Sequence, residues 1–210
     1  MKPVFITFEG GEGAGKSTQI GLLSEYLRSL GLEVVTTREP GGSPDADTLR
    51  ELLVTGEPGR WSPQAEALLN YAARESHLNH LIRPALAAGK TVLCDRFADS
   101  TRAYQGIAGQ VGTDFVEMLD QAIVGSSQPD LTLIFDLDPQ VGLERAHQRG
   151  GADRFEKKGL RFHQNLRKAF LEIAGNNPAR CRVIDASGSV EQVAAQIRAC
   201  VEQSIGKLAS

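Results

Sequence analysis

The sequence predicts an α/β fold in which helices flank a five-stranded parallel sheet. The first observation is that short apolar runs alternate with longer stretches in which apolar residues recur at helical spacing. The second is that the first strand, helix and strand together span about 35 residues, the size of one βαβ unit. Because such a connection joins parallel strands, the alternating pattern predicts a parallel sheet.

The strands are predicted from nearly continuous apolar runs, which are typical of strands buried on both faces. The first run occupies residues 4–8 and ends just before a glycine-rich turn. The apolar period then becomes helical, and Gly31 follows at the position of a helix C-cap. The remaining strands are predicted at residues 32–37, 91–95, 131–137 and 181–185.

Helical patterns fill the later intervals, near residues 64–88, 113–124, 140–148, 160–174 and 190–205. Pro84 lies inside the longest of these patterns and is expected to kink the helix. Residues 39–47 and 149–156 are predicted to be mobile loops because they are rich in glycine together with proline or charge. Since no repeat or shift in composition divides the chain, residues 1–210 are expected to form a single domain, with a lid at about 149–156.

Composition excludes several classes of protein. The 210 residues include 23 Lys and Arg against 26 Asp and Glu, a net charge of −3, which argues against a protein that coats a nucleic-acid polymer. No apolar run approaches the ~20 residues that span a bilayer, so no membrane partner is expected. The N-terminal segment turns acidic too early for a signal peptide, and three cysteines without CxxC spacing argue against disulfides or structural zinc. We therefore expect a cytoplasmic protein.

The turn after the first strand fits the pattern G-x-x-x-x-G-K-[ST]. Its residues are Gly10, Gly11, Glu12, Gly13, Ala14, Gly15, Lys16 and Ser17, and Thr18 follows. Glycines let backbone N–H groups turn inward around anionic oxygens, while Lys16 can reach the β- and γ-phosphates and Ser17 can offer its hydroxyl to Mg²⁺. The motif predicts a nucleoside triphosphate site, in which the Glu12 carboxylate needs a cation, a metal or a sugar hydroxyl beside it.

The end of the third strand narrows the class of triphosphate-binding protein. Guanine-binding GTPases carry an N-K-x-D segment, which this sequence lacks. Motor ATPases place a glutamate after the aspartate that ends this strand, whereas here Asp95 is followed by Arg96. Because ligands bind beyond the carboxyl ends of parallel strands, Arg96 is expected to grip a second phosphate, with a structural ion pair as the alternative.

Further polar residues could complete a site for two nucleotides. Arg145 and Arg149 share one helix face and, with Arg154 beyond the glycines, could close over the triphosphate; a solvated helix face is the alternative. Arg74, on the longest helix, could equally be a surface arginine. A sugar and a base could be held by a stretch that could also be a polar helix start, namely Ser100, Thr101, Tyr104 and Gln105.

In order along the chain, these segments resemble the thymidylate kinases. The resemblance spans about residues 4–186 and rests on residues 8–18, 37–42, 71–74, 95–97 with 100–106, 130–133 with 136, and 142–145 through 153–156. It implies a P-loop nucleoside monophosphate kinase fold and a homodimer. It also implies a Mg²⁺-dependent transfer of the γ-phosphate of ATP to dTMP, which gives dTDP and ADP in dTTP synthesis.

For the ATP side, the resemblance implies that residues 10–18 bind ATP and that Ser17 contacts Mg²⁺. Glu12 would approach the metal and the deoxyribose 3′-hydroxyl. Gly13 stands where one branch of the family has a catalytic arginine, so the chain resembles the bacterial-type branch, in which the lid supplies it. The implied catalytic residues are Lys16, Arg96, Glu12 and a lid arginine, with Arg149 as first choice and Arg145 as second.

For the dTMP side, the resemblance implies that Arg96 clamps the phosphate and that Arg74 and Thr101 read the thymine edge. Tyr104 would disfavour a ribose, and Ser100 and Gln105 would complete the dTMP site. The family commonly has Phe four residues before the base-reading arginine; here Asn70 stands there, so either Tyr71 or another ring stacks on the base, or dTMP binds more weakly. A kinase for dUMP or another monophosphate, and an ATP-binding sensor without catalysis, are the alternative functions.

Overall fold

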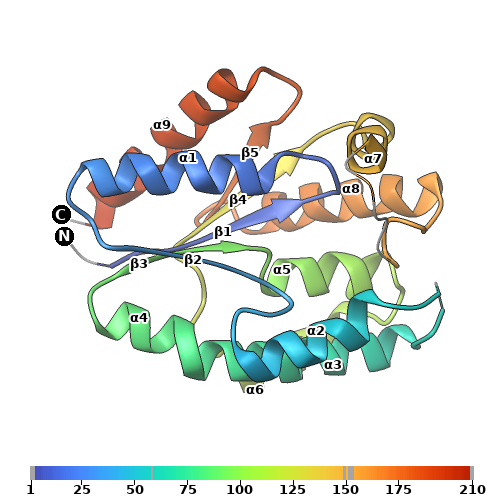
Figure 1. The fold of residues 1–210 in the computed structure, drawn as a ribbon. Helices are drawn as coiled ribbons and strands as arrows, with labels where there is room; N and C mark the ends of the chain where they lie inside the picture. Colours follow the sequence, from blue (N-terminus) through green and yellow to red (C-terminus); the bar gives the residue numbers. More distant parts are fainter. Residues whose placement is uncertain (1–2, 58, 149, 151–153, 209–210) are drawn as a thin grey trace.

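The computed structural model describes residues 3–57, 59–148, 150 and 154–208. Its strands form one parallel sheet in the order β2-β3-β1-β4-β5 (Figure 1). Their bounds are β1 Phe5–Gly10, β2 Val34–Arg38, β3 Thr91–Asp95, β4 Leu131–Asp136 and β5 Cys181–Asp185. The predicted fold class is confirmed. Strand β1 extends beyond the predicted run because Glu9 and Gly10 pair with Ile134 and Phe135 of β4.

Helices cover both faces of this sheet. Helices α1 (Lys16–Ser29) and α9 (Val190–Leu208) pack on one face, whereas α3 (Pro63–His77), α6 (Thr113–Ile123) and α8 (Leu160–Asn176) cover the other (Figure 1). The shorter helices are α2 (Pro44–Val54), α4 (Arg83–Ala87), α5 (Ala98–Thr101) and α7 (Pro139–Gln148), and the π-helical turns are η1 (Leu78–Ile82) and η2 (Arg102–Ile107). Within the described ranges, no helix is both long and apolar enough to cross a membrane.

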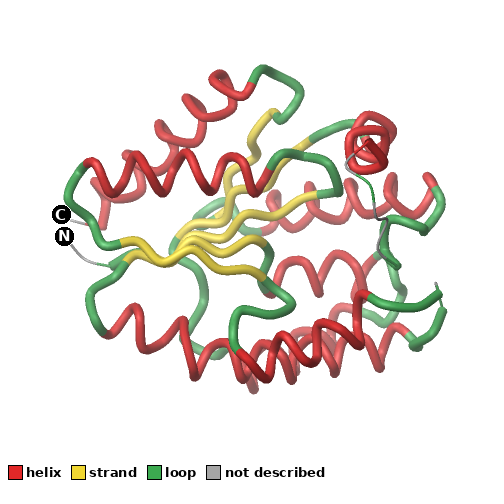
Figure 2. The backbone as a smooth tube through the Cα atoms, viewed as in Figure 1, coloured by secondary structure: helices red, strands yellow, loops and turns green. Residues whose placement is uncertain are grey.

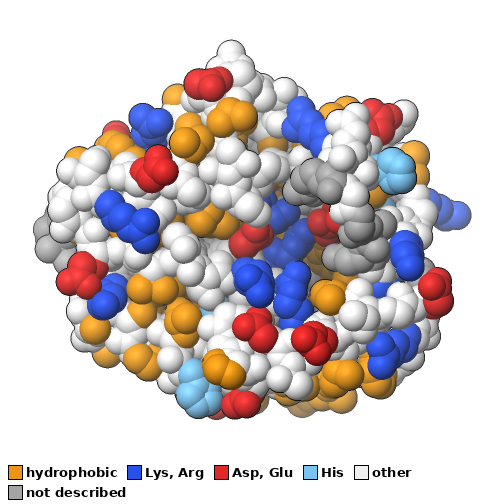
Figure 3. Space-filling view, viewed as in Figure 1, with side chains coloured by type: hydrophobic (Ala, Val, Ile, Leu, Met, Phe, Trp, Pro, Cys, Tyr) orange, Lys and Arg blue, Asp and Glu red, His pale blue; other side chains and the backbone are white. Residues whose placement is uncertain are grey.

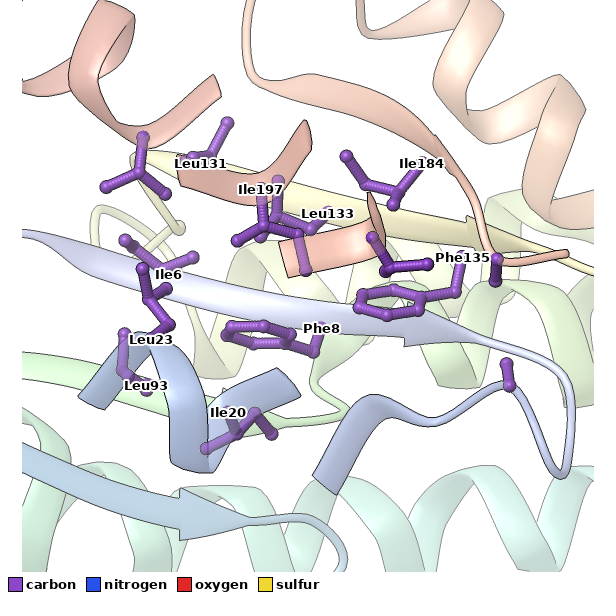
Figure 4. Packing of buried hydrophobic residues seen from close by; sticks show 14 of the residues in the cluster. Ile6, Phe8, Ile20, Leu23, Leu93, Leu131, Leu133, Phe135, Ile184 and Ile197 are labelled. Atoms are coloured by element: carbon purple, nitrogen blue, oxygen red, sulfur yellow. The ribbon is translucent and has the colours of Figure 1, made fainter. Parts of the chain in front are cut away.

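Alternate residues of β1 build the core on the two faces of the sheet. Ile6 and Phe8 lie in the cluster that includes Ile20 of α1 (Figure 4). Phe5 packs on the other face, where its ring meets that of Phe97 at a centroid distance of 5.0 Å. Because both faces are covered, every residue of β1 is buried, which explains why its sequence up to Phe8 is apolar except for Thr7, whose hydroxyl bonds to that of Thr132.

Helix α2 begins inside the segment predicted as a loop at residues 39–47, so that loop prediction is wrong beyond residue 43. Ser43 is extended, Pro44 occupies the first helical turn, and Asp45 and Asp47 place negative charge near the positive end of the helix dipole. These start signals prevail over the glycine-rich stretch before them. Residues 39–43 remain a loop, which begins with a cis Glu39-Pro40 peptide bond.

The long helical pattern at residues 64–88 is divided by a change of helix type ahead of Pro84. Proline lacks an N–H group, and its ring clashes with the carbonyl four residues earlier in an α-helix. The turn η1 precedes it, and the N–H group of Arg83 donates to Leu78, five residues back. The predicted distortion is therefore present as a π-helical turn, and the boundary residues His77, Leu78, Ile82 and Arg83 keep right-handed helical dihedral angles.

Candidate active site

A cavity of about 410 Å³ opens at the carboxyl ends of β1, β2 and β3. The loops that follow these strands lie at the same end of the sheet (Figure 2). Figure 3 shows a hollow in which Lys and Arg side chains gather beside Asp and Glu. Lys16 and Arg96 both line this cavity. The two cations predicted to bind phosphates therefore face a single chamber.

The turn between β1 and α1 is shaped by its glycines. Gly13 and Gly15 have φ angles of 66° and 85°, in the left-handed region that side chains disfavour. Residues 12–18 line the cavity, whereas Gly10 and Gly11 direct their carbonyls to Lys16, with oxygens 3.3 and 2.8 Å from Nζ. Burial, followed by the charge of Arg96, lowers the pKa of Lys16 to about 8. An anion bound beside Nζ would offset this destabilisation of the ammonium group.

A second pair of groups lies where the triphosphate's metal ion is expected. The hydroxyl of Ser17 donates to the Asp95 carboxylate at 2.8 Å, and both residues line the cavity. Hydroxyl and carboxylate oxygens suit Mg²⁺, which needs only one or two protein ligands when phosphates and water complete its shell. This pair fits the cation, although the described residues contain no cluster of three acidic, His or Cys side chains that could hold a metal alone. Ser17 was predicted as a ligand from the motif, whereas Asp95 was not.

Arg96 bridges the phosphate turn and the predicted sugar-binding residues. Its φ of 71° is uncommon for a residue other than glycine. Its Nη1 donates to the carbonyl of Gly10 and its Nη2 to the Glu12 carboxylate, each at 2.8 Å, and the hydroxyl of Tyr104 donates to the same Glu12 oxygen at 2.6 Å. Burial alone would raise the pKa of Glu12, but Arg96 and Lys16 outweigh it and lower the pKa to about 2. Glu12 is therefore held as an anion inside the phosphate turn.

Glu9, at the end of β1, holds the start of α5 beside the cavity. Its carboxylate accepts from the N–H groups of Phe97 and Ser100, at 2.8 and 3.2 Å, and from the Ser100 hydroxyl at 2.6 Å. Burial, followed by the charge of Asp99, raises the pKa of Glu9 to about 7. These bonds fix Ser100, which lines the cavity.

Arg74 lies directly behind the cavity wall and does not itself line the cavity. Its Nε donates to Glu39 at 2.8 Å and its Nη2 to Thr101 at 3.1 Å, and both of these partners do line it. The guanidinium carbon lies 4.5 Å from the ring centroid of Tyr71 and 5.2 Å from that of Phe97. Within the described part of the chain, the buried Nη1 has no hydrogen-bond partner. A base carbonyl that entered the cavity could supply that partner.

The structure brings most of the predicted dTMP-binding residues together, but Tyr71 is an exception. Ser100, Thr101, Tyr104 and Gln105 line the cavity, as does Asn70. Tyr71 is buried instead, where its hydroxyl bonds to the carbonyl of Val116 and the carboxylate of Asp120, each at 3.3 Å. Contrary to expectation, Tyr71 does not line the cavity in this structure, and its ring packs against the guanidinium group of Arg74 instead.

The predicted lid arginines occupy different environments. Arg149 lies outside the described residues. Helix α7 turns Gly142 and Ala146 inward, so Arg145 is exposed on its outer side and does not line the cavity, contrary to expectation. Arg154 is fully buried, and its guanidinium donates to the carbonyl of Leu53 at 2.9 Å and to the Glu66 carboxylate. In this structure Arg154 thus joins the lid segment to α2 and α3.

Other cavity residues have no role assigned from sequence alone, namely Arg38, Glu39, Pro40, Arg50, Val54, Phe155 and Glu156. Glu66 is also given no role from the sequence, although its carboxylate accepts hydrogen bonds from both Gln105 and Arg154. One signal could have indicated it. Glu66, Asn70 and Arg74 are spaced four residues apart, and therefore lie on one side of α3.

Comparison with known proteins identifies one family throughout. The family model described as "Thymidylate kinase" matches residues 8–197. A thymidylate kinase from Caulobacter vibrioides is 56% identical over 96% of this chain and 97% of its own, and one from Afipia carboxidovorans is 53% identical over 92% and 86%. The crystal structure of thymidylate kinase from Ehrlichia chaffeensis superposes with a TM-score of 0.79, at 32% identity over 96% of this chain and all of the other.

Proposed function

The chain belongs to the thymidylate kinase family and phosphorylates dTMP to dTDP with ATP, and we propose that both nucleotides react in the cavity described above. One observation carries this proposal. The carbonyl of Gly10 accepts hydrogen bonds from both Lys16 and Arg96, at 3.3 and 2.8 Å, so the two cations lie side by side at the same chamber. Phosphoryl transfer requires such cations around two phosphate groups held end to end.

On the ATP side, the N–H groups of the turn at residues 10–15 and the start of α1 would hold the phosphates, with Lys16 at the β- and γ-phosphates. Ser17 and Asp95 would hold Mg²⁺, which supplies positive charge against the negative charge of the transferred group when it is bound. The lid at about 149–156 would cover ATP; Arg154, near its end, is bonded to Leu53 of α2 and to Glu66 of α3.

On the dTMP side, Arg96 would orient the attacking phosphate, with Ser100 beside it. That phosphate oxygen is already anionic, so the reaction needs no general base. Glu12 and Tyr104 would lie near the deoxyribose, because their side chains are joined at the cavity wall. Nη1 of Arg74 would donate to the thymine edge beside Thr101, which removes the unpaired buried donor.

The remaining parts of the proposal follow the resemblance of the sequence. Residues 1–210 would form one domain, and two copies would form a homodimer in the cytoplasm. The partners would be ATP and dTMP rather than a nucleic-acid polymer or a membrane. Size-exclusion chromatography with light scattering tests the dimer.

The deciding experiment supplies ATP and Mg²⁺ with a panel of nucleoside monophosphates in a coupled assay for ADP release. We expect dTMP to be the preferred acceptor. The panel includes dUMP because Asn70 replaces a stacking ring, which favours a second candidate, a kinase with another pyrimidine acceptor. ATP binding without transfer to any acceptor would contradict both kinases and favour an ATP-binding sensor.

Two substitutions test the mechanism within that assay. Lys16→Ala and Arg96→Ala should each lower turnover by about 100-fold or more, because each removes a cation that offsets charge in the transition state. Lys90→Ala is the matched control, since Lys90 forms an ion pair with Glu33 on the surface. Turnover like that of the wild type in either cavity variant would contradict the mechanism.

A further inference from the structure

A buried chain of polar side chains leads from Arg74 to the far side of the loop at residues 39–43. One oxygen of the Glu39 carboxylate accepts from Nε of Arg74 at 2.8 Å, and the other bonds to Nδ1 of His77 at 3.0 Å. Nε2 of His77 lies 2.8 Å from the hydroxyl oxygen of Thr37. Since a carboxylate only accepts hydrogen bonds, Nδ1 of His77 carries a proton. Glu39 is therefore held from both sides.

The hydrogen-bonded side chains of Arg74, Glu39, His77 and Thr37 are enclosed so closely that they have little freedom to rearrange. His77 is fully buried, and Glu39 is 5% exposed. The loop passes directly over the imidazole at Gly42, whose φ is 92° and where a Cβ atom would come within 2.4 Å of Nε2 of His77 and 2.5 Å of the Thr37 hydroxyl. A glycine there lets the backbone cover the histidine, and that cover fixes the position of Glu39.

As a consequence, only one nitrogen of the Arg74 guanidinium group lacks a hydrogen-bond partner within the described residues, namely Nη1. Glu39 holds Nε, Thr101 holds Nη2, and the rings of Tyr71 and Phe97 lie against the guanidinium plane. Nη1 itself lies between two nitrogens whose partners, Glu39 and Thr101, line the cavity. A guanidinium held at two of its nitrogens cannot rotate to suit a different ligand.

We infer that Glu39 and His77 are positioning residues that set the choice of base by fixing Nη1 of Arg74 as a donor toward the pyrimidine 4-position. This inference rests on the proposed function. Thymine carries a carbonyl acceptor at that position, whereas cytosine carries an amino donor, which would face Nη1 donor to donor. A rigid arginine rejects cytosine because both groups would remain unpaired, whereas a mobile arginine could turn away.

Two substitutions of His77 separate its contacts. The amide nitrogen of an asparagine can reach the place of Nδ1, so His77→Asn keeps a donor to Glu39 and loses the contact to Thr37. A glutamine reaches the place of Nε2, so His77→Gln keeps the contact to Thr37 and loses the donor to Glu39. Glu39→Gln is a third variant of equal size, in which an amide replaces the charged acceptor of Arg74. His80→Gln is the control, because His80 is an exposed histidine three residues after His77 and contacts the carbonyl of Ser76 rather than Glu39.

The measurement is kcat and KM for dTMP, for dCMP and for ATP, together with the melting temperature of each variant. We expect His77→Gln and Glu39→Gln to raise KM for dTMP about tenfold or more, from the loss of a charged hydrogen bond. Both variants should lower the ratio of kcat/KM for dTMP to kcat/KM for dCMP, and both should leave KM for ATP unchanged. His77→Asn and His80→Gln should keep the preference of the wild type.

Other outcomes would overturn the inference. These are an unchanged preference in Glu39→Gln, or an equal loss in His77→Asn and His77→Gln. If the His77 variants do not fold, Glu39→Gln alone decides, because Gln matches Glu in size; a failure of that variant to fold would make Glu39 structural and overturn the inference as well. A wild-type protein without dTMP kinase activity would refute the proposed function itself, whereas an active wild type with unchanged Glu39→Gln selectivity refutes only the inference.

Discussion

The charged residues of the cavity are held by one another before any nucleotide binds. Arg96 contacts Gly10 and Glu12, and Lys16 contacts Gly10 and Gly11. The left-handed backbone of Arg96, with φ of 71°, is a strained conformation that these contacts hold in place. Groups fixed in this way need little rearrangement when charge develops on a transferred phosphoryl group, which is the main source of catalysis in such reactions.

The buried carboxyl of Glu9 predicts a dependence of stability on pH. Burial and the charge of Asp99 raise the pKa of Glu9 from 4.5 to about 7. The folded protein thus holds this proton more tightly than the unfolded chain, so the contribution to stability is full below pH 4.5 and is lost as the pH rises through 7. The loss amounts to a few kcal/mol at most, at about 1.4 kcal/mol for each pKa unit.

Glu9→Gln isolates this effect. A glutamine keeps an oxygen that accepts from the N–H groups of Phe97 and Ser100, but it cannot ionise. The free energy of unfolding, measured by urea denaturation across that pH range, should decline for the wild type relative to the variant. Parallel curves for the two proteins would contradict a raised pKa for Glu9.

Residue roles could be predicted from sequence where a short motif defines them. Lys16 and Ser17 follow from the spacing of the glycines, and Arg96 follows from its place after a buried strand. The buried acids could not be predicted, because their partners are distant in the chain: Glu9 bonds to Phe97, 88 residues away, and Glu39 bonds to Arg74, 35 residues away. Such pairs exist only after the sheet has brought the segments together.

At the scale of elements, α7 supports the phosphate turn through two glycines. A Cβ atom at Gly142 would lie 2.3 Å from the carbonyl oxygen of Glu12, and one at Gly13 would lie 2.0 Å from the carbonyl oxygen of Gly142. The two backbones therefore touch without side chains between them. This close approach requires a glycine at both positions, and Gly142 is accordingly buried within α7.

Gly142→Ala should displace α7 from the phosphate turn, because the added methyl group overlaps a backbone atom that cannot move away cheaply. We expect kcat/KM for ATP to fall about tenfold or more and the melting temperature to fall. Gly21→Ala is the matched control, since Gly21 is exposed within α1 and a Cβ atom there meets nothing within 4 Å. That control should gain about 0.5–1 kcal/mol of stability and keep its activity. Wild-type kinetics in Gly142→Ala would contradict the role of this contact.

Helix α3 links the cavity to the lid segment through a buried ion pair. The side chains of Arg154 and Glu66 are 0% and 3% exposed. Removal of either partner leaves an uncompensated buried charge, so Glu66→Met and Arg154→Met should each cost about 3 kcal/mol in the free energy of unfolding. The double variant should cost much less than the sum, as measured by urea denaturation in a double-mutant cycle. The exposed pair Lys157 and Glu57 serves as control and should show almost no coupling. Strictly additive losses at Glu66 and Arg154 would contradict this interpretation.

The strands could be predicted to within two residues because the runs of the central strands β1, β3 and β4 are nearly continuously apolar, and these strands are buried along almost their whole length. The start of helix α2 could not be predicted, because the glycine-rich residues before it resemble part of a longer loop. The π-helical turns η1 and η2 have no periodicity that distinguishes them from an α-helix over so few residues. Local pattern thus predicted the sheet better than the helices that shape the cavity.

At the scale of the whole molecule, the strand order explains where the cavity lies. Strand β1 is flanked by β3 and β4, and the helix that follows β1 packs on one face while the chain after β3 passes to the other. A crevice opens at the carboxyl ends where successive connections leave on opposite faces. The same rule predicts that Arg96, at the carboxyl end of β3, lies in the crevice beside the phosphate turn.

A single chamber for two nucleotides makes a prediction for a linked ligand. An analogue that joins adenosine and thymidine through a chain of phosphates should raise the melting temperature more than the two separate nucleotides at equal concentration. The reason is that binding of one half holds the other at a high effective concentration, and a ligand that binds only the folded state stabilises it according to its affinity. Arg96→Ala should remove most of this advantage, because Arg96 is the cation proposed to hold the dTMP phosphate next to Lys16. If the linked compound raised the melting temperature no more than the more tightly binding of the two nucleotides alone, the two nucleotides would occupy separate sites.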